Sequence, residues 1–493
     1  MNQIVIIEFI CYCLFILGIG YIFSRKDFGH SDFLLGGKKL PGWVLAFSER
    51  ATGESAWLLL GYTGFVFATG LSAVWVAVGI SSGIICSWLF LAKRFMKEAE
   101  KYNVITLPGY FAKRFTRHSK IILWLSTVLI ASFMMFYFGA QIAGAGKTLF
   151  TVFNIHPIVG AILSMMIVIT LSYLGGFVAV VWTDMVQSIM MLLTLVVLPL
   201  VALYHIFTAD LSISHALSSS SASLDSWTGG TVGFALGILL FNNFAWFFGF
   251  LGGQPQLSAR FMALKDDKEA RTASIVAIVW TIFAYGGAFA IGITAITLYQ
   301  GEAFADVETI LPYMMLDLLP PWIAGLLLAG ILAAIISTAD SQLLVITSSI
   351  SEDIVHYALG IKLTEKQLVA VSRLTIIIAG LVGLFIALTS RSLVYIVVSW
   401  AWAGVGGTLS PVIILTFFWK RYSSIGVIAT IIAGFISTVV WISTPLDEII
   451  SSRFTTFFIA TLFGIIFSFL FPEKEDVKEV ESHPDDTTPS KVM

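Results

Sequence analysis

Long runs of apolar residues alternate with short polar segments along almost the whole chain. About thirteen of these runs reach the roughly 20 residues that a helix needs to cross a bilayer. Their centres fall near Phe15, Leu59, Ala77, Ile130, Ile167, Leu193, Phe241, Ile282, Ile331, Ile378, Trp400, Ile431 and Phe463. The pattern predicts an all-α polytopic membrane protein with about 13 transmembrane helices.

The second apolar run contains the stretch SERATGESAWLLLG, residues 48–61, which is unusual for a membrane helix. Glu49, Arg50 and Glu54 are charged, and Gly53 is a weak helix former. Charged side chains at bilayer depth normally face a cavity, a partner or a functional site. We therefore expect a broken helix whose freed carbonyls can coordinate a cation. The alternative is that Glu49 and Arg50 only mark the water-facing start of the helix.

The seventh run is interrupted as well. It ends in FNNFAWFFGFLGGQP, residues 241–255, where Pro255 closes a Gly-rich segment. Interrupted segments at corresponding places in two halves point to a transporter's binding site. Five spans run from the second to the sixth and five from the seventh to the eleventh, which predicts two inverted repeats. The expected units are 1–42, a first helix and loop; 43–205, the first repeat; 206–230, an external, mobile Ser-rich loop; 231–421, the second repeat; 422–471, two accessory helices; and 472–493, a disordered cytoplasmic tail.

Lys and Arg residues gather in every second loop, which indicates the cytoplasmic side. The N-terminus is then outside, the C-terminus is inside, and the protein resides in the inner or plasma membrane. The basic loops hold Arg25, Lys26, Lys38 and Lys39; Lys93, Arg94, Lys97, Lys101, Lys113, Arg114, Arg117 and Lys120; Arg260, Lys265, Lys268 and Arg271; Lys362, Lys366 and Arg373; and Lys420 and Arg421. The alternate loops hold Lys147, Arg391 and Arg453.

Composition agrees with this class and excludes others. Of the 493 residues, 58% are hydrophobic and 12% are charged, about half the charged fraction of a soluble domain. No basic, aromatic-interleaved patch suggests nucleic acid. The three Cys lie in apolar runs and the seven His show no ligand spacing, so neither a disulfide framework nor a metal cluster is implied. We also find no nucleophile–base pair or phosphate loop, and we expect a protein that is not an enzyme.

The ninth run contains ILAAIISTADSQLL, in which Ala334, Ser337 and Thr338 share one helix face. Two hydroxyls, the carbonyl of Ala334 and freed carbonyls around Ala51 and Glu54 would offer Na⁺ a set of hard oxygens. Uncharged ligands of this kind can release the ion as well as hold it. The alternative is that the hydroxyls bond to their own helix or hold helices together.

Three carboxylates at membrane depth are candidates for function. Asp184 is a functional candidate or else lies near the cytoplasmic interface. Asp340 is a functional candidate or else has a capping or network role. Glu54 is an ion ligand, a proton-titrating group or the i+4 partner of Arg50, and we favour the salt bridge. Nearby aromatics, Trp246 and Phe250 among them, would cover a small organic substrate or serve as ordinary packing.

Seven segments, in order, resemble the sodium/solute symporter family, and most closely its sodium/proline symporter branch. The likeness extends over nearly the whole chain and implies a fold of two inverted five-helix repeats, the LeuT-like fold. The segments are DFLLGGKKLPGW, SAWLLLGYTG, TLPGYFAKRF, GGFVAVVWTDMVQ, GQPQLSARFMA, ILAAIISTADSQLLVITSSISEDI and SWAWAGVGG.

The resemblance also implies site residues. The family's common sodium site maps onto the carbonyls of Ala51, Glu54 and Ala334 and the hydroxyls of Ser337 and Thr338. A second sodium site of some relatives would map onto Asp184, Ser337, Asp340 and Ser341. Substrate contacts would map onto Ser55, Trp246, Phe250 and Pro255.

The chain departs from the proline branch at these same places. Gly53 stands where that branch carries an Asp tied to sodium dependence, and the carboxylate appears one residue later, at Glu54. Phe250 replaces a Tyr among the substrate contacts, and an extra Gly follows it at Gly252 or Gly253. These changes affect the expected identity of the substrate more than the expected coupling to sodium.

The sequence therefore predicts a Na⁺-coupled symporter of a small amino acid, with proline as the best single candidate, that works by alternating access in the lipid bilayer without a cofactor. One alternative is proton coupling through Glu54 or Asp340, and another is Na⁺-coupled transport of a different small organic solute. A non-transporting substrate sensor is the third, although the short tail after Pro472 offers no signalling domain. A channel fits the interrupted helices less well.

Overall fold

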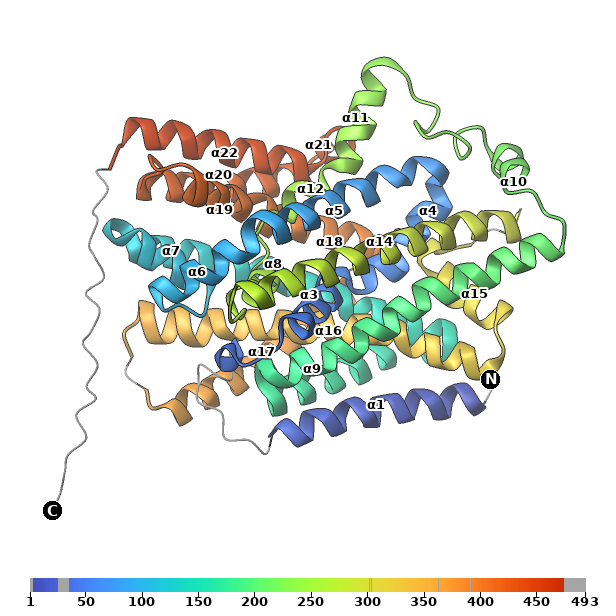
Figure 1. Ribbon diagram of the computed structural model, residues 1–493, viewed down its shortest axis with the longest axis horizontal. Coiled ribbons are helices and arrows are strands. Elements are labelled where there is room, and N and C mark those ends of the chain that lie inside the picture. The colour runs from blue at the N-terminus through green and yellow to red at the C-terminus, as the bar shows by residue number, and fades with distance from the viewer. Residues whose placement is uncertain are drawn as a thin grey trace.

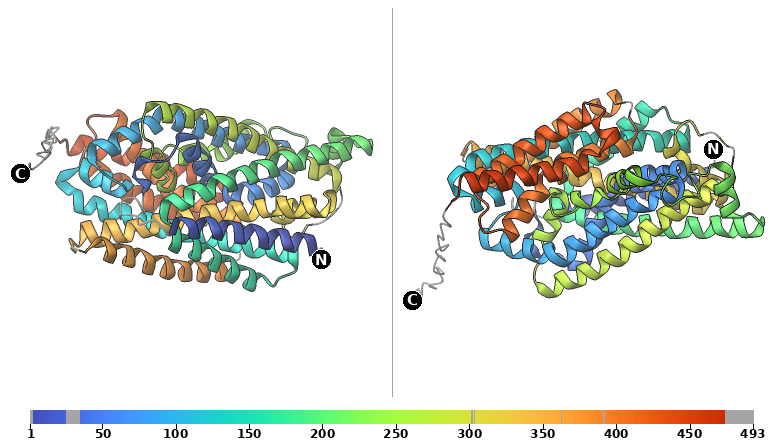
Figure 2. Two further views of the ribbon diagram at one scale, coloured as in Figure 1. Left: turned by 60° about the horizontal axis from the view of Figure 1, so that its bottom comes forward. Right: turned by 90° about the horizontal axis from the view of Figure 1, so that it is seen from above.

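The computed structural model describes residues 3–24, 35–300, 302, 304–361, 363–390 and 392–473. Within these ranges the protein is a helical bundle without strands (Figure 1). Eleven helical segments are long and apolar enough to cross a membrane. Two further views show that most helices run roughly along the long axis of the molecule (Figure 2).

The predicted spans and these segments describe the same parts of the chain. The second and third predicted spans lie in one segment, Gly42–Tyr102, and the seventh is the shorter apolar helix Gly233–Gly249. At Gly70 the backbone φ is +65°, and the chain turns there between the second and third spans. The prediction of about 13 transmembrane helices therefore agrees with the architecture.

The N-terminal half contains the first interrupted helix. Its elements are α1 (Gln3–Ser24), η1 (Gly36–Lys38), α3 (Gly42–Ala56), η2 (Trp57–Tyr62), α4 (Thr63–Thr69), η3 (Gly70–Ala73), α5 (Val74–Cys86), η4 (Ser87–Leu91), α6 (Ala92–Tyr102), α7 (Leu107–Arg114), η5 (Thr116–His118), α8 (Ser119–Phe153), α9 (Pro157–Thr208) and α10 (Ile213–Ser220). The fifth and sixth predicted spans are Pro157–Leu174 and Gly176–Thr208, the two parts of α9, and the backbone leaves the helical conformation between them at Gly176, with φ 56° and ψ −164°.

The C-terminal half contains the second interrupted helix, divided among α11, α12 and α13. Its elements are α11 (Gly233–Phe244), α12 (Trp246–Gly249), α13 (Pro255–Met262), α14 (Asp267–Leu298), η6 (Val307–Thr309), α15 (Ile310–Leu318), α16 (Pro321–Ser348), η7 (Ser349–Ala358), α17 (Glu365–Thr389), α18 (Val394–Trp402), η8 (Ala403–Gly407), α19 (Thr408–Phe418), α20 (Ser424–Ile442), α21 (Leu446–Ile449) and α22 (Ser452–Leu470).

Helix α16 forms the centre of the bundle. Every side chain from Leu327 to Thr347 is buried, and α3, α8 and α9 pack around it. Helix α1 lies along α9 and α16 at one side, and α20 and α22 pack together at the opposite side (Figure 1). The core therefore brings α3 and α16, the two helices with the predicted sodium ligands, into direct contact.

The Ser-rich loop contains a short helix and has contacts with the rest of the bundle, and its mobility stays a prediction. It contains α10, and its later part bonds to the turn between α4 and α5: the Leu71 N–H donates to the Leu224 carbonyl at 3.0 Å, and the Trp75 indole donates to the Trp227 carbonyl at 2.8 Å. A Cβ at Gly70 would lie 2.3 Å from the Leu224 oxygen, so this close approach needs glycine.

Many of the basic residues that we assigned to loops lie in helices, and three of them differ from the expectation by their burial or their partners. Lys147 is in α8 and pairs with Asp306 and Glu308, whereas Arg260 in α13 and Arg453 in α22 are buried. Each has polar partners that compensate the loss of water, and span counting alone does not show such pairing. Four more of the basic residues, Arg25, Lys26, Lys362 and Arg391, lie outside the described residues, as does the predicted tail beyond residue 473.

Candidate ion and substrate site

The break in the second span occurs at Ser55. This residue has φ 49° and ψ −169°, a conformation that residues other than glycine rarely adopt. The Ser55 hydroxyl accepts the Trp57 N–H at 3.0 Å, and Gln141 on α8 accepts the Ala56 N–H at 3.2 Å. Side chains therefore satisfy backbone groups that the interrupted helix leaves free, as membrane depth requires.

Two hydroxyls of α16 meet carbonyls of α3 just before this break. The Ser337 hydroxyl lies 3.2 Å from the Ala51 oxygen and 3.1 Å from the Ala334 oxygen. The Thr338 hydroxyl lies 3.3 Å from the Ala51 oxygen and 3.1 Å from the Thr52 oxygen. All of these residues are fully buried. The structure thus brings together the oxygens of Ala51, Ala334, Ser337 and Thr338.

Glu54 and Thr52 differ from the expected set. The Glu54 carbonyl accepts the Trp57 N–H across the break, whereas the α16 hydroxyls bond to the carbonyls of Ala51, Thr52 and Ala334. The Thr52 carbonyl takes part instead, and the sequence analysis missed it. Thr52 lies between Ala51 and the weak helix former Gly53, and this position could have identified its carbonyl as a candidate ligand.

This cluster of oxygens suits Na⁺. Hard cations prefer oxygen ligands, and backbone carbonyls and hydroxyls are among them. Each hydroxyl here donates its proton to a carbonyl, so its lone pairs are available to a cation. The cluster carries no formal charge, which favours reversible binding.

A buried charge cluster lies on the same helix. The Arg50 guanidinium contacts Glu49 through both Nε, at 2.6 Å, and Nη2, and its Nη1 lies 2.7 Å from Glu54. Tyr285 on α14 donates to the other Glu54 oxygen, and the Trp88 indole donates to Glu49 at 3.0 Å. The favoured salt bridge between Arg50 and Glu54 is confirmed. The alternative of a water-facing helix start is wrong, because Glu49 and Arg50 are both buried.

A second charge cluster forms around Arg260. Its Nη2 lies 3.1 Å from Asp184 Oδ2 and 2.6 Å from Ser341 Oγ, and its Nε lies 3.2 Å from Ser48 Oγ. The Thr52 hydroxyl joins the cluster, at 2.9 Å from Ser341 and 3.3 Å from Asp184. Arg260 was counted as a loop cation, and nothing in the sequence pairs it with Asp184.

Asp340 does not bond to the Arg260 cluster in the described chain. Its Oδ1 accepts the Ser172 hydroxyl of α9 at 2.7 Å. Of the predicted second sodium site, the structure therefore brings Asp184 and Ser341 together, while Ser337 bonds within the first oxygen cluster and Asp340 bonds to α9.

The predicted substrate contacts lie mainly in an aromatic cluster beside the break. The rings of Trp57 and Trp246 have centroids 4.5 Å apart, and those of Phe250 and Trp402 are 4.1 Å apart. The Tyr137 hydroxyl donates to Ser55 at 3.2 Å. Trp57, Tyr137 and Trp402 were missed, because their aromatic character alone does not distinguish them from packing residues.

Arg453 approaches this cluster from the accessory helix α22. Its guanidinium carbon lies 4.3 Å from the Trp246 ring centroid, within the range of a cation–π contact. Its Nη1 donates to Ser399 at 2.7 Å and its Nη2 to the Asn242 carbonyl at 3.2 Å. An arginine predicted to lie in a loop is therefore a wall of the aromatic cluster.

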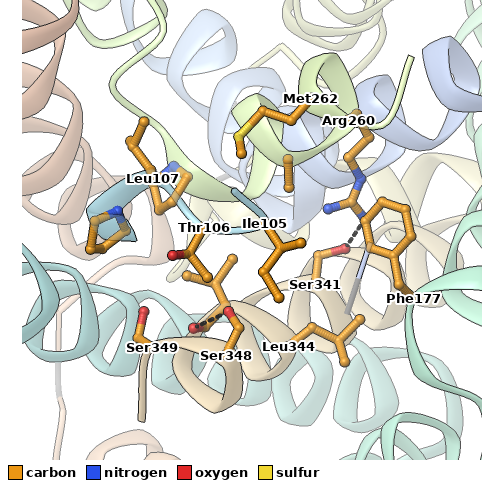
Figure 3. A pocket seen from close by; sticks show the side chains of 14 residues that line it. Ile105, Thr106, Leu107, Phe177, Arg260, Met262, Ser341, Leu344, Ser348 and Ser349 are labelled. Carbon is orange, nitrogen blue, oxygen red and sulfur yellow. Dashed lines mark hydrogen bonds between the residues drawn. The ribbon is translucent and has the colours of Figure 1, made fainter. Parts of the chain in front are cut away.

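Pro255 belongs to a different place, a pocket between α7, α13 and α16. The pocket also contains Thr106, Arg260, Ser341 and Ser349 in its lining. Figure 3 shows the Arg260 guanidinium and the Ser341 hydroxyl pointing toward each other in this pocket. The Arg260 cluster thus lies between the pocket and the oxygen cluster of α3 and α16.

Comparisons with known proteins agree with this architecture. The family model described as "Sodium:solute symporter family" matches residues 33–434. The high-affinity proline transporter PutP of Bacillus subtilis is 33% identical over 452 residues, which are 91% of this chain and 94% of that protein. The sodium/proline symporter of Escherichia coli is 31% identical over 442 residues, 88% of this chain and 87% of that protein.

Solved structures show the same fold. A Na⁺-coupled sialic acid symporter in a substrate-bound outward-open state has a TM-score of 0.78 at 20% identity, covering 96% of this chain and 99% of that one. MhsT in complex with L-phenylalanine has a TM-score of 0.54 at 14% identity, covering 87% and 97%. These likenesses confirm the predicted LeuT-like fold.

Proposed function

The chain belongs to the sodium:solute symporter family, and from that premise we propose that it carries proline into the cell together with Na⁺. The observation that carries the proposal is the meeting of the Ser337 and Thr338 hydroxyls with the Ala51 carbonyl just before the break at Ser55. Proline is the best candidate because the relatives that cover most of this chain are named as proline transporters.

The proposed sodium ligands are the carbonyls of Ala51 and Ala334 and the hydroxyls of Ser337 and Thr338, with the Thr52 carbonyl beside them. The Glu54 carbonyl stays a predicted ligand that would require a small movement at the break. Because the ligands come from two helices, bound Na⁺ would hold α3 against α16. A ligand that binds one conformation more tightly shifts the population toward it, and Na⁺ would in this way prepare the substrate site.

The proposed substrate site is the region around Ser55, Trp246 and Phe250. The aromatic rings offer an apolar surface for the proline ring, and the hydroxyls of Ser55 and Tyr137 offer polar contacts for its charged groups. Pro255 supports this region through the backbone of the interrupted helix, since its own side chain lines the separate pocket next to Arg260.

We also propose that the N-terminus is outside and the C-terminus is in the cytoplasm. The exposed Lys and Arg residues around α6, α7 and α14 support this orientation, because cytoplasmic loops are enriched in them. The pocket of Figure 3 then faces the cytoplasm and forms the inner end of the route.

The test is uptake of radiolabelled proline into proteoliposomes with and without an inward Na⁺ gradient. We expect accumulation only with the gradient. Ser337→Ala and Thr338→Ala should each raise the Na⁺ concentration for half-maximal uptake by about tenfold or more, which corresponds to about 1.4 kcal/mol of lost binding. Ser126→Ala is a matched control, because the hydrogen bonds of this buried serine in the described part of the chain stay within its own helix α8. Wild-type sodium dependence in both site variants would contradict the assignment.

A further inference from the structure

The place predicted for a second sodium ion contains a cation that belongs to the chain. The Arg260 guanidinium bonds to Asp184 and Ser341, two of the four residues predicted to bind that ion. It is held from three further directions, by the Ser48 hydroxyl, by the Gln256 carbonyl at 2.8 Å, and by the Phe177 ring, whose centroid lies 5.2 Å away. The surrounding groups therefore bind the guanidinium specifically.

Charge and burial make the guanidinium and a second Na⁺ alternatives to each other. Asp184 and Arg260 are each at most 1% exposed, and Asp184 forms an ion pair with Arg260. The pair is neutral as it stands. An added Na⁺ that shared Asp184 and Ser341 would place two positive charges next to one carboxylate in a medium of low dielectric constant, where repulsion between like charges is strong.

The remaining predicted ligands are not assembled at this place. Ser337 uses its hydroxyl in the first oxygen cluster, and Asp340 bonds to Ser172. Asp184 Oδ1 and Asp340 Oδ2 have no hydrogen-bond partner in the described chain. With Arg260 bonded to Asp184 Oδ2 and to Ser341, these two unpartnered oxygens fall short of the several oxygen ligands that a hard cation requires. The residues present therefore fit a guanidinium and do not fit a second sodium ion.

Thr52 links this place to the proposed sodium site. Its carbonyl lies near the Thr338 hydroxyl, and its own hydroxyl bonds to Ser341 and Asp184. Only Thr52 therefore separates the Arg260 cluster from the proposed sodium ion, and Arg260 itself lines the pocket in Figure 3.

From this arrangement we infer that Arg260 is a built-in substitute for a second sodium ion, so that the chain binds a single Na⁺. The inference rests on the proposed sodium site at Ala51, Ser337 and Thr338. It assigns Arg260 as the residue that determines the number of ions bound, and it assigns Asp184 and Ser341 to the arginine.

The experiment counts bound sodium on the purified full-length protein without any organic substrate. Equilibrium binding of ²²Na⁺, measured by scintillation proximity at saturation, gives ions per protein directly. The wild type should bind one. Arg260→Gln should bind two, because Asp184 then lacks a cation. Arg260→Lys, which keeps the charge, should bind one, and Arg260→Gln combined with Asp184→Asn should return to one.

Several outcomes would overturn the inference. A wild type that binds two ions, or a folded Arg260→Gln protein that still binds one, contradicts it. If the glutamine variant does not fold, Ser341→Ala decides: the count stays at one if Arg260 fills the place, and falls from two to one if sodium does. A wild type that binds no sodium would instead contradict the proposed sodium site itself, which separates the two failures.

Discussion

Arg50 in helix α3 and Arg260 in the neighbouring helix α13 are both buried, but their charges are compensated in different ways. Arg50 pairs with Glu49 and Glu54, which belong to its own helix. Arg260 pairs with Asp184 of α9 and bonds to hydroxyls from α3 and α16. Both ion pairs of Arg50 lie within α3, with Tyr285 and Trp88 adding hydrogen bonds to the carboxylates, whereas the Arg260 cluster connects four helices.

The two clusters also differ in charge. With its carboxylates ionised, the Arg50 cluster has two negative groups for one positive group, and the Arg260 pair has one of each. The excess negative charge therefore lies on the half of α3 that leads to the break, close to the proposed sodium site. The neutral pair contacts the same stretch of α3 through Ser48 and Thr52. The difference suggests that α3 attracts one cation and that Arg260 excludes another.

The largest effect should come from removing Arg50. Arg50→Met leaves two buried carboxylates without their cation, and breaking a buried pair costs about 3–5 kcal/mol. We expect a large drop in the thermal unfolding midpoint and in folded yield. Arg271→Met, at an exposed position, is the control. Adding Glu49→Gln and Glu54→Gln should restore most of the loss. An unchanged midpoint in Arg50→Met would show that the ion pairs of Arg50 do not stabilise the fold.

Asp184→Asn should have a smaller effect, because only one pair is broken. Ser48, Ser341 and the Gln256 carbonyl still hold the guanidinium. We expect a loss of about 3 kcal/mol, the lower end of the range for buried pairs. The measurement is thermal unfolding in the same detergent as for Arg50→Met. A loss equal to or larger than that of Arg50→Met would reverse the comparison.

Tyr285→Phe tests the excess charge on Glu54. The change removes the hydroxyl that donates to this carboxylate and keeps the ring. A hydrogen bond to a charged group contributes about 1.5–3 kcal/mol, and we expect a loss near the lower value because Arg50 remains. Tyr204→Phe, at an exposed position, is the matched control. Equal midpoints for the two variants would show that Tyr285 does not stabilise the cluster.

Thr52→Val should have the smallest effect on stability. It removes the hydroxyl bonded to Ser341 and Asp184 but keeps the carbonyl beside Thr338. The bond to Ser341 is neutral and contributes about 0.5–1.5 kcal/mol, and the bond to the Asp184 carboxylate is long at 3.3 Å, so the unfolding midpoint should change little. The Na⁺ concentration for half-maximal uptake should also stay within about twofold, less than 1 kcal/mol of binding. A complete loss of sodium binding in the folded variant would place the Thr52 hydroxyl among the sodium ligands.

The same comparison explains what the sequence could predict. Glu54 follows Arg50 by four residues, and Ser337 and Thr338 share a face with Ala334, so helical spacing was enough to predict these contacts. Arg260 and Asp184 are 76 residues apart, and Arg453 and Trp246 come from different ends of the second half. Their pairing depends on how helices pack, which periodicity does not specify.

The fold was easier to predict from the sequence than the site. Apolar runs identified the spans, and Gly53 and Pro255 marked the interrupted helices, because both residues weaken a helix. The exact residue at which the helix breaks was harder to predict. The positive φ falls on Ser55 rather than on Gly53, and the side chains of Ser55 and Gln141 that support it come from two helices.

The central claim is that one sodium ion, held between α3 and α16, drives the uptake of proline. The most direct measurement is the reversal potential of proline flux in proteoliposomes with fixed sodium and proline gradients, since the potential of zero flux gives the coupling ratio. We predict one sodium ion for each proline. A ratio of two, or a flux that does not depend on sodium, would contradict the account.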